Sequence, residues 1–452
     1  MKFTGRIICI LLCAALLALS CGWAREEATD HVAEAGAVLD QMLGGDFAAV
    51  TARFDDSIAG QITPEALGEA WQGQVASLGE FAGIGDSTTV DRDGEVLVRL
   101  LVEFDAGGII LNCVFNETMK LTGLYMEPVP ESEAAVQGIE VPLPEGASES
   151  EVKLFEGEDN ELNGALVLPA DYGDNTPAVV FAHGSGATDM DETIGPNKPF
   201  RDIAYGLAEK GIASIRYDKM IYAHPELAAL PDANIDTEYT EAVLEALDTI
   251  KNVEGIGDVY LIGHSQGGML TPYLIRKSGD GGFAGGVIMA GSPRQLWEIS
   301  LSQNRALIEL LPEDQRDAAN QQLDAEIARA EQLQDMTDEQ AMEEVVFGAS
   351  AYYLKHMGGI SEIGAALESG GLSLLIMQGE NDVQVSMEED FAAWRNALEG
   401  EGDFTFISYP GLNHLFMAGE GTIADAMQSY QQPAVVDSAV INDIAEWILK
   451  LT

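Results

Sequence analysis

The chain has 452 residues, of which 46% are hydrophobic and 22% are charged, a balance typical of a folded globular protein. Lysine and arginine total 23 against 75 aspartates and glutamates, which gives a formal net charge of −52. This charge excludes general electrostatic binding to nucleic acid, which needs basic side chains against phosphate. It also disfavours an anionic membrane surface, unless a covalent anchor holds the protein there. We interpret the acidic excess as a solvated surface, with adaptation to salt or acid as the alternative.

Residues 1–24 have the pattern of an export signal. Basic residues precede an apolar run over 7–19, which is too short to span a membrane and suits a signal sequence. Two processing sites compete: small residues at 22–24 permit cleavage after Ala24, whereas 18–21 resembles a bacterial lipobox with cleavage before Cys21. We favour the lipobox, which would place a lipid anchor on Cys21. Both alternatives predict an exported protein, either a cell-membrane lipoprotein or a freely secreted one.

Cysteine usage argues against both disulfides and a cysteine metal site. Three of the four cysteines lie within the first 21 residues, and only Cys113 belongs to the body of the chain. A single cysteine cannot form a disulfide framework or a zinc site. We therefore predict that Cys113 is a small buried hydrophobic residue.

Residues 26–127 predict a small α+β domain. Helical periodicity comes first, and the apolar period falls to two after Gly85, which indicates helices followed by an antiparallel meander with hairpin turns. The expected helices are 33–43, 46–54 and 64–78, and the expected strands are 87–90, 95–104, 109–115 and 119–126. No catalytic constellation is visible in this domain.

Residues 128–150 have the composition of a linker, with prolines among acidic residues, and one short strand is expected at 139–141.

In 151–452, strands and helices alternate, which predicts an α/β domain with a doubly wound, mostly parallel sheet. The expected strands are 151–155, 162–168, 178–182, 213–217, 259–262, 286–289, 373–377 and 404–408, and the expected helices are 199–210, 237–252, 267–277, 388–398 and 435–449. The sixth and seventh strands are too far apart for a simple crossover. We therefore predict an inserted helical cap over about 294–360.

The strand at 259–262 runs into the motif Gly263-His264-Ser265-Gln266-Gly267, and a helical pattern follows at once. G-x-S-x-G between a strand and a helix is the context of a nucleophile elbow, in which a sharp turn presents the serine hydroxyl above the sheet. The flanking glycines leave room for neighbouring backbone. We predict that Ser265 is the nucleophile; the alternative is a glycine-rich loop with an idle serine.

A serine nucleophile requires a base, and only His356 and His414 follow Ser265 in the sequence. His356 lies in the predicted cap, where we interpret it as a surface residue of a helix. His414 follows the last predicted strand, in a loop at the carboxyl end of the sheet. We therefore predict that His414 takes the proton from Ser265 and returns it to the leaving group.

The acid that orients the base is expected after the strand at 373–377. Asp382 fits best, because it would hold the His414 imidazole in one tautomer and stabilise its protonated form. Glu380 is the alternative, since either carboxylate in this loop could orient a histidine.

An oxyanion hole requires two backbone N–H groups aimed at the developing negative charge. One is expected from Gln266, the residue after the nucleophile. The other is expected from the loop His183-Gly184-Ser185-Gly186, with Ser185 as the first choice and Gly186 next. Small residues in this loop let the backbone approach a substrate.

Together these motifs resemble the α/β-hydrolase superfamily. The matching segments are HGSG at 183, GHSQG at 263, QGENDVQV at 378 and GLNH at 411, and residues 140–452 look like such a hydrolase with its cap between the sixth and seventh core strands. The small domain resembles the one that precedes the hydrolase in some exported bacterial esterases, a cystatin-like cone. The resemblance implies cleavage of carboxylic esters through an acyl-enzyme, with a small-molecule ester as substrate and with no cofactor or metal.

Two other functions stay open. A serine peptidase or amidase could use the same triad and fold, although the relevant peptidases usually carry a propeller, for which the small domain is too short. A non-catalytic cell-envelope binding protein is the second alternative, and the intact set Ser265, Asp382 and His414 argues against it. The sequence predicts no nucleic-acid partner and no membrane contact except through the possible lipid anchor. It leaves open the oligomeric state, the acyl and alcohol groups of the substrate, and the role of the small domain.

Overall fold

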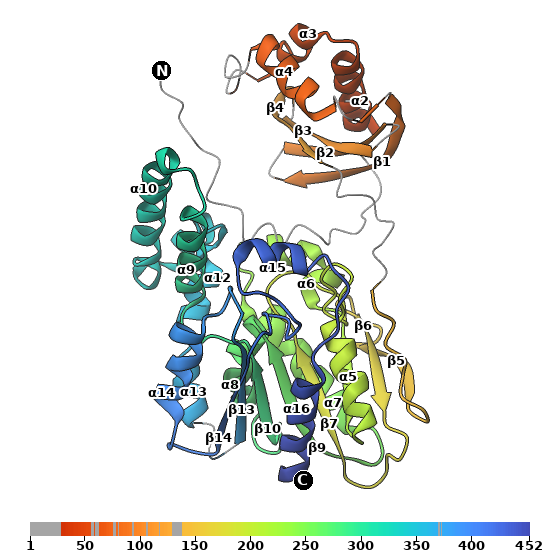
Figure 1. The fold of residues 1–452 in the computed structure, drawn as a ribbon, viewed down its shortest axis with the longest axis vertical. Helices are drawn as coiled ribbons and strands as arrows, with labels where there is room; N and C mark the ends of the chain where they lie inside the picture. Colours follow the sequence, from red (N-terminus) through yellow and green to blue (C-terminus); the bar gives the residue numbers. More distant parts are fainter. Residues whose placement is uncertain are drawn as a thin grey trace. The chain divides into compact units, whose positions relative to one another are not determined.

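The computed structural model describes residues 29–452 except 56, 57, 59–62, 76, 77, 80, 93, 94, 105, 106, 117, 129–137, 369, 370 and 372. The predicted export signal and Cys21 lie outside the described residues. The contacts divide the chain into two compact units, one formed by the described residues up to 128 and the other by those from 138 onward (Figure 1).

The first unit packs helices against an antiparallel meander. Its elements are α2 (Thr29–Leu43), α3 (Phe47–Thr51), α4 (Pro64–Val75), β1 (Phe81–Arg92), β2 (Glu95–Phe104), β3 (Gly107–Asn116) and β4 (Leu121–Pro128), with the strands in the order β1-β2-β3-β4. Asp46 caps α3 by accepting a hydrogen bond from the Ala49 N–H. Cys113 on β3 is fully buried in the core of this unit, and burial raises the pKa of its thiol to about 12. The prediction of a buried hydrophobic cysteine is confirmed.

The second unit is built on a mixed, mostly parallel sheet. Its strands are β5 (Ser148–Leu154), β6 (Leu162–Leu168), β7 (Thr176–Ala182), β8 (Ala213–Tyr217), β9 (Ile256–His264), β10 (Gly285–Met289), β13 (Ser373–Gly379) and β14 (Phe404–Tyr409). Their order in the sheet is β14-β13-β10-β9-β7-β8-β6-β5. The pairs β5–β6 and β6–β8 are antiparallel, and the others are parallel. The prediction of a doubly wound α/β sheet is confirmed.

Hydrophobic cores cover both faces of this sheet, which explains the continuous apolar runs of its strands. Every residue of β7 is buried; Val180 faces one core and Val179 the other. Helices α7 (Glu241–Lys251), α8 (Gln266–Ser278) and α14 (Ala392–Leu398) contribute to the first core, and α5 (Pro199–Glu209) and α16 (Ser438–Leu451) to the second (Figure 1). The remaining short helices are α6 (Met220–Ala223), η1 (Pro225–Ala229), η2 (Asp236–Thr240), η4 (Met387–Phe391) and α15 (Ile423–Ser429).

The expected strand at 139–141 is wrong. This segment has no regular structure, and the Ile139 carbonyl accepts a hydrogen bond from the Arg201 guanidinium, at 3.1 Å. Pro142 and Pro144 follow it, and a proline cannot donate the N–H that a strand ladder requires. The alternating apolar residues of this segment therefore do not form a strand.

A helical insertion separates β10 from β13, as the sequence predicts. Its elements are α9 (Leu296–Ile308), α10 (Glu313–Ala330), η3 (Leu333–Asp335), α11 (Asp338–Glu343), β11 (Val345–Val346), β12 (Ala349–Ser350) and α12 (Ala351–Gly358), and α13 (Glu362–Glu368) returns the chain to the sheet. Two small hydrophobic clusters hold this cap together.

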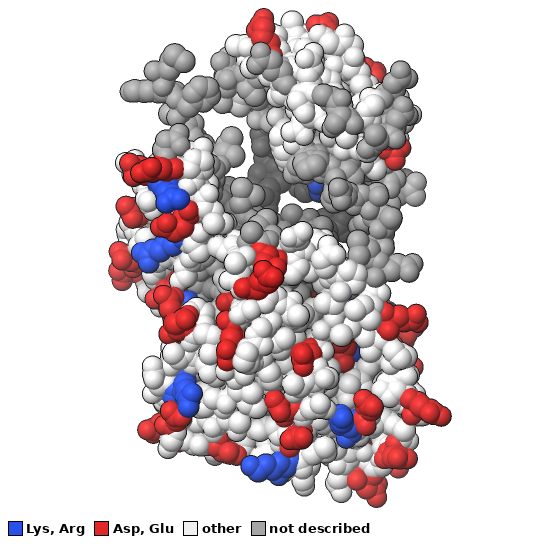
Figure 2. All heavy atoms as spheres, in the orientation of Figure 1, with Lys and Arg blue, Asp and Glu red and all other residues white. Residues whose placement is uncertain are grey.

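Acidic side chains are spread over the visible surface of the second unit, with few basic ones between them (Figure 2). Among the described helices, none combines the length and the apolar character needed to cross a bilayer.

Candidate active site

Ser265 lies at a strained turn between β9 and α8. Its backbone angles are φ 53° and ψ −115°, a region that residues with a side chain rarely adopt. A Cβ atom at position 263 would come within 2.2 Å of the Gly267 carbonyl oxygen, and one at position 267 would come within 2.1 Å of the Ala182 carbonyl oxygen. The turn can therefore close only with glycine on both sides of the motif. The Ser265 N–H is bonded to the Met289 carbonyl of the neighbouring strand, at 2.8 Å.

His414 and Asp382 form a buried pair at the carboxyl ends of β14 and β13. His414 Nδ1 donates to Asp382 Oδ2 at 2.7 Å, and both residues are buried. Asp382 also accepts hydrogen bonds from the Gln378 side chain and from the N–H groups of Gln384 and Val385, at 2.7, 2.7 and 3.0 Å. Because the carboxylate and Nδ1 are held in this way, Nε2 is the imidazole nitrogen left to exchange a proton.

The two alternative site residues have other partners. The Glu380 carboxylate accepts from the Ser408 hydroxyl at 2.8 Å on the exposed surface, so the structure pairs His414 with Asp382 and not with Glu380. His356 lies on α12 with its ring stacked against that of Tyr352, at 6.4 Å between centroids. Neither residue contributes to the pair described above.

The nucleophile motif and the base loop lie against each other. His264 is the residue next to Ser265, and its Nε2 donates to the His414 carbonyl oxygen at 2.9 Å. The centroids of the His264 and His414 rings are 4.8 Å apart. In the described part of the chain, no hydrogen bond joins the Ser265 hydroxyl to the His414 ring. Catalytic hydrogen bonds of this kind are often long before substrate binds. The sheet edge thus brings the three predicted triad residues into one region.

The loop after β7 lies beside Ser265, where the sequence predicts an oxyanion hole. A Cβ at position 184 would come within 3.2 Å of the Ser265 Cβ. The Gly184 N–H is already bonded to the Glu192 carboxylate at 2.6 Å, which leaves the next residues, Ser185 and Gly186, as donors from this loop. The Ser185 hydroxyl donates to the Gln266 side-chain oxygen at 2.9 Å. The residues predicted to supply the two donors are therefore neighbours.

A second buried histidine–carboxylate pair, which the sequence analysis missed, lies beside the first. His264 Nδ1 is 2.9 Å from Glu192 Oε2, and their side chains are 5% and 2% exposed. Burial lowers the pKa of His264, but the Glu192 carboxylate outweighs this effect and the pKa is raised. Burial likewise favours a neutral Glu192, but the His264 imidazole overrides it and lowers the pKa of that carboxyl. Both ring nitrogens of His264 thus face acceptors, and the pair joins the Gly184 N–H to the His414 carbonyl.

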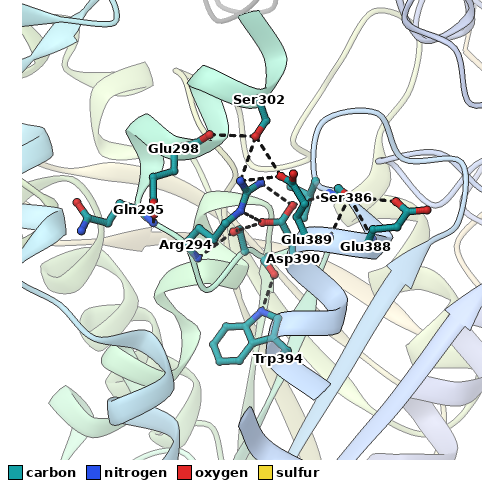
Figure 3. Close-up of polar contacts among 12 residues, drawn as sticks. Arg294, Gln295, Glu298, Ser302, Ser386, Glu388, Glu389, Asp390 and Trp394 are labelled. Carbon is teal, nitrogen blue, oxygen red and sulfur yellow. Dashed lines mark hydrogen bonds and ion pairs between the residues drawn. The ribbon is translucent and has the colours of Figure 1, made fainter. Parts of the chain in front are cut away.

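A polar cluster fixes the acid loop to the first residue of the cap (Figure 3). Asp390 lies in η4, the short helix that follows the loop of Asp382, and is fully buried. Its two carboxylate oxygens accept from Arg294 Nε and Nη2, at 2.6 and 3.0 Å. The Ser386 N–H donates to the same carboxylate at 2.6 Å, one residue after the Val385 N–H that holds Asp382. We call this ion pair between Arg294 and Asp390 the clasp. Through the Ser386 N–H, it connects the loop that holds Asp382 to the first residue of the cap.

A cavity of about 120 Å³ lies between the cap and the segment before α7. Apolar side chains such as Ile221 and Leu227 form part of its lining, together with the polar groups of Glu238 and Tyr353. The Tyr353 hydroxyl accepts a hydrogen bond from the Gln266 side chain at 2.7 Å. The cavity is thus one hydrogen bond away from the residue that follows the nucleophile.

The chain belongs to the α/β-hydrolase family. Residues 179–425 match the family model described as "Alpha/beta hydrolase family", which confirms the resemblance drawn from the motifs. Residues 35–124 match a model described as "Protein of unknown function (DUF3887)", and they cover most of the first unit.

A particular relative matches both units. The chain is 30% identical over 397 residues to Esterase EstD of Thermotoga maritima. The aligned region covers 87% of this chain and 90% of that protein. Similar solved structures include Est1E from Butyrivibrio proteoclasticus, with 15% identity and a TM-score of 0.42 over 67% of this chain and 98% of that one. Another is the proline iminopeptidase of Mycobacterium smegmatis, with 19% identity and a TM-score of 0.42 over 67% and 98% of the two chains.

His183, at the start of the oxyanion loop, should make the protein sensitive to acid. Its ring is buried between those of Phe200 and Tyr217, and this burial lowers its pKa from 6.5 to about 4. The unfolded chain binds a proton at this residue below pH 6.5, whereas the folded chain does not until about pH 4. The stability that neutral His183 contributes is therefore complete above pH 6.5 and is lost as the pH falls to 4, by about 3 kcal/mol.

Calorimetric unfolding of the His183→Phe variant at pH 7 and pH 4.5 measures this effect. We expect the variant to lose less stability than the wild type between the two pH values. His31→Gln, in the other unit, is the control and should behave like the wild type. An unchanged pH dependence in His183→Phe would contradict the assignment.

Proposed function

We propose that the protein is an exported serine hydrolase that cleaves carboxylic esters of small molecules through an acyl-enzyme, with Ser265, His414 and Asp382 as its triad and without a cofactor. The observation that carries the proposal is the buried Asp382–His414 hydrogen bond, located at the sheet edge where the strained Ser265 follows β9. The relative named as an esterase, which matches nearly the whole chain, supports ester hydrolysis as the reaction.

The proposed reaction uses the triad and the two backbone donors in turn. His414 Nε2 accepts the Ser265 proton as Oγ attacks the ester carbonyl carbon, and the carbonyl oxygen becomes an oxyanion. The N–H groups of Gln266 and Ser185, or of Gly186 in place of Ser185, stabilise that charge. His414 then protonates the departing alcohol. Asp382 stabilises the imidazolium in both transfers, and a water molecule repeats the sequence to release the acid and free Ser265.

Export is part of the proposal and rests on the N-terminal sequence pattern. A basic start, an apolar run and the lipobox-like segment at 18–21 support processing before Cys21 and a lipid on its side chain. The anchor would hold an acidic protein at a membrane that its surface charge disfavours. The mass of the mature N-terminal peptide distinguishes a lipidated Cys21 from cleavage after Ala24.

A fluorophosphonate probe tests the proposed function, because it reacts covalently with an activated serine. We expect one adduct per chain, on the peptide that contains Ser265, and no adduct in Ser265→Ala. We also expect a 4-nitrophenyl ester to be hydrolysed faster than the matching 4-nitroanilide. An unlabelled wild-type protein would support the binding-protein alternative, and preference for the anilide would support the amidase.

A further inference from the structure

Behind the oxyanion loop lies a buried ammonium that the reaction scheme above does not use. Lys219, just after β8, has a side chain that is 1% exposed. Its Nζ lies 2.7 Å from each of three acceptors: the Gly184 carbonyl oxygen, the Tyr239 hydroxyl and Glu238 Oε1. Three acceptors match the three N–H donors of an ammonium, whereas a neutral amine has only two. Burial lowers the pKa of Lys219, and the Glu238 carboxylate offsets this effect only in part.

The lysine acts on the peptide group that carries a predicted oxyanion donor. The Gly184 carbonyl oxygen accepts from Lys219 Nζ and, at 2.9 Å, from the Tyr239 hydroxyl. The Gly184–Ser185 peptide bond is trans, so this carbonyl and the Ser185 N–H point in opposite directions. Groups that hold the carbonyl on one side therefore aim the N–H on the other side. Because Glu192 holds the N–H of Gly184 itself, the loop is fixed at both ends of that residue.

Charge adds to this positioning effect. A cation bonded to an amide oxygen polarises the amide and makes its N–H a stronger donor, because linked hydrogen bonds reinforce each other. The effect is larger in a buried site, where water does not screen the lysine. The strengthened donor is of most use when the carbonyl oxygen of the substrate becomes an oxyanion, which happens only at the transition state.

Hydrogen bonds continue from the lysine to the other oxyanion donor. Glu238 is bonded to the Tyr353 hydroxyl of the cap, and that hydroxyl accepts from the Gln266 side chain at 2.7 Å. The Gln266 side-chain oxygen in turn accepts from the Ser185 hydroxyl. A closed ring of contacts thus links Lys219 to both residues whose N–H groups form the oxyanion hole.

We propose that Lys219, assisted by Tyr239, is a positioning residue of the oxyanion hole that aims and polarises the Ser185 N–H through the Gly184 carbonyl. This inference rests on the proposed function, because it assumes that Ser185 stabilises an oxyanion. Lys219 touches no reacting atom, so its removal should affect the transition state while leaving substrate binding nearly unchanged.

The experiment compares Lys219→Met and Tyr239→Phe with the wild type, using kcat and KM for a 4-nitrophenyl ester and Ki for a trifluoromethyl ketone, which forms an oxyanion on the serine. We expect Lys219→Met to lower kcat by roughly 100-fold and Tyr239→Phe by roughly 10-fold, with KM nearly unchanged. Affinity for the ketone should fall by the same factors as kcat. A lysine with a purely structural role would not lower kcat and the affinity for the ketone by the same factor.

Two controls keep the result interpretable. The double variant Lys219→Met/Glu238→Gln removes both buried charges and so guards against misfolding from an unpaired carboxylate; it should show the same loss of kcat. Lys210→Met makes the same substitution at an exposed position and should behave like the wild type. Unchanged kcat and ketone affinity in folded variants, or a loss confined to KM, would overturn the inference. Fluorophosphonate labelling of the wild type is measured first, because its failure would refute the proposed function instead.

Discussion

Replacement of Ser265 by alanine is expected to lower kcat for ester hydrolysis by roughly 10⁴- to 10⁶-fold, and His414→Ala should have a similar effect. Both losses follow from the same step, because the serine is a weak nucleophile unless the histidine removes its proton. The double variant should be hardly slower than either single variant, since residues that act as a unit do not contribute additively. Initial rates with a chromogenic ester, at high enzyme concentration, measure all three.

His356→Ala is the matched control, because it removes the other histidine that follows Ser265 in the sequence. His356 is stacked on Tyr352 in the cap and is absent from the hydrogen bonds around Asp382. We expect its turnover to stay within a few-fold of the wild type. A loss as severe as that of His414→Ala would show that the base has been assigned to the wrong histidine.

Asp382→Asn should lower kcat by roughly 10⁴-fold while leaving the fold intact. The asparagine amide cannot accept the His414 Nδ1–H in the same way and favours the tautomer whose Nε2 carries the proton. That tautomer cannot remove a proton from Ser265. The steady-state kcat with the ester used above measures the loss, and the circular dichroism spectrum checks the fold.

Glu380→Gln makes the equivalent change on the same loop and serves as the control for Asp382→Asn. Its carboxylate contacts Ser408 on the surface, and we expect nearly full activity. If Glu380→Gln were the more damaging variant, the orienting acid would be Glu380, and the loop would have to rearrange when substrate binds.

The sheet could be predicted from the sequence because its strands are buried on both faces and appear as continuous apolar runs. Strand β1 was harder: the expected segment was 87–90, whereas β1 spans Phe81–Arg92. Gly83 and Gly85 weaken the pattern of its first half. Pairing with β2 overrides this low propensity, and a Cβ at position 85 would come within 2.7 Å of the Leu101 side chain. The glycine is thus explained by a neighbour that only the fold reveals.

The predicted triad residues share one rule, which is that the carboxyl ends of parallel strands meet at a single sheet edge. Lys219, just after β8, lies at the same edge, but neither its burial nor that of Glu192 follows from this rule. Each is a charged residue buried by partners far along the chain, and hydrophobic periodicity shows only where apolar side chains are buried. One signal was available in the sequence: His264 occupies the variable position inside the G-x-S-x-G motif, so its ring is close to the nucleophile. A buried imidazole there requires a partner, which the structure identifies as Glu192.

The clasp between Arg294 and Asp390 sets a boundary for anyone who wishes to exchange the cap for that of another hydrolase. A graft that begins before Arg294 would remove the guanidinium and leave the buried Asp390 carboxylate without its positively charged partner. Breaking a buried ion pair in this way costs roughly 3–5 kcal/mol, enough to unfold many domains. A graft that begins at Gln295 keeps the clasp, and with it the backbone that holds Asp382. Arg294, the first residue of the cap, therefore has to stay with the hydrolase domain, and the exchangeable part of the cap begins at Gln295.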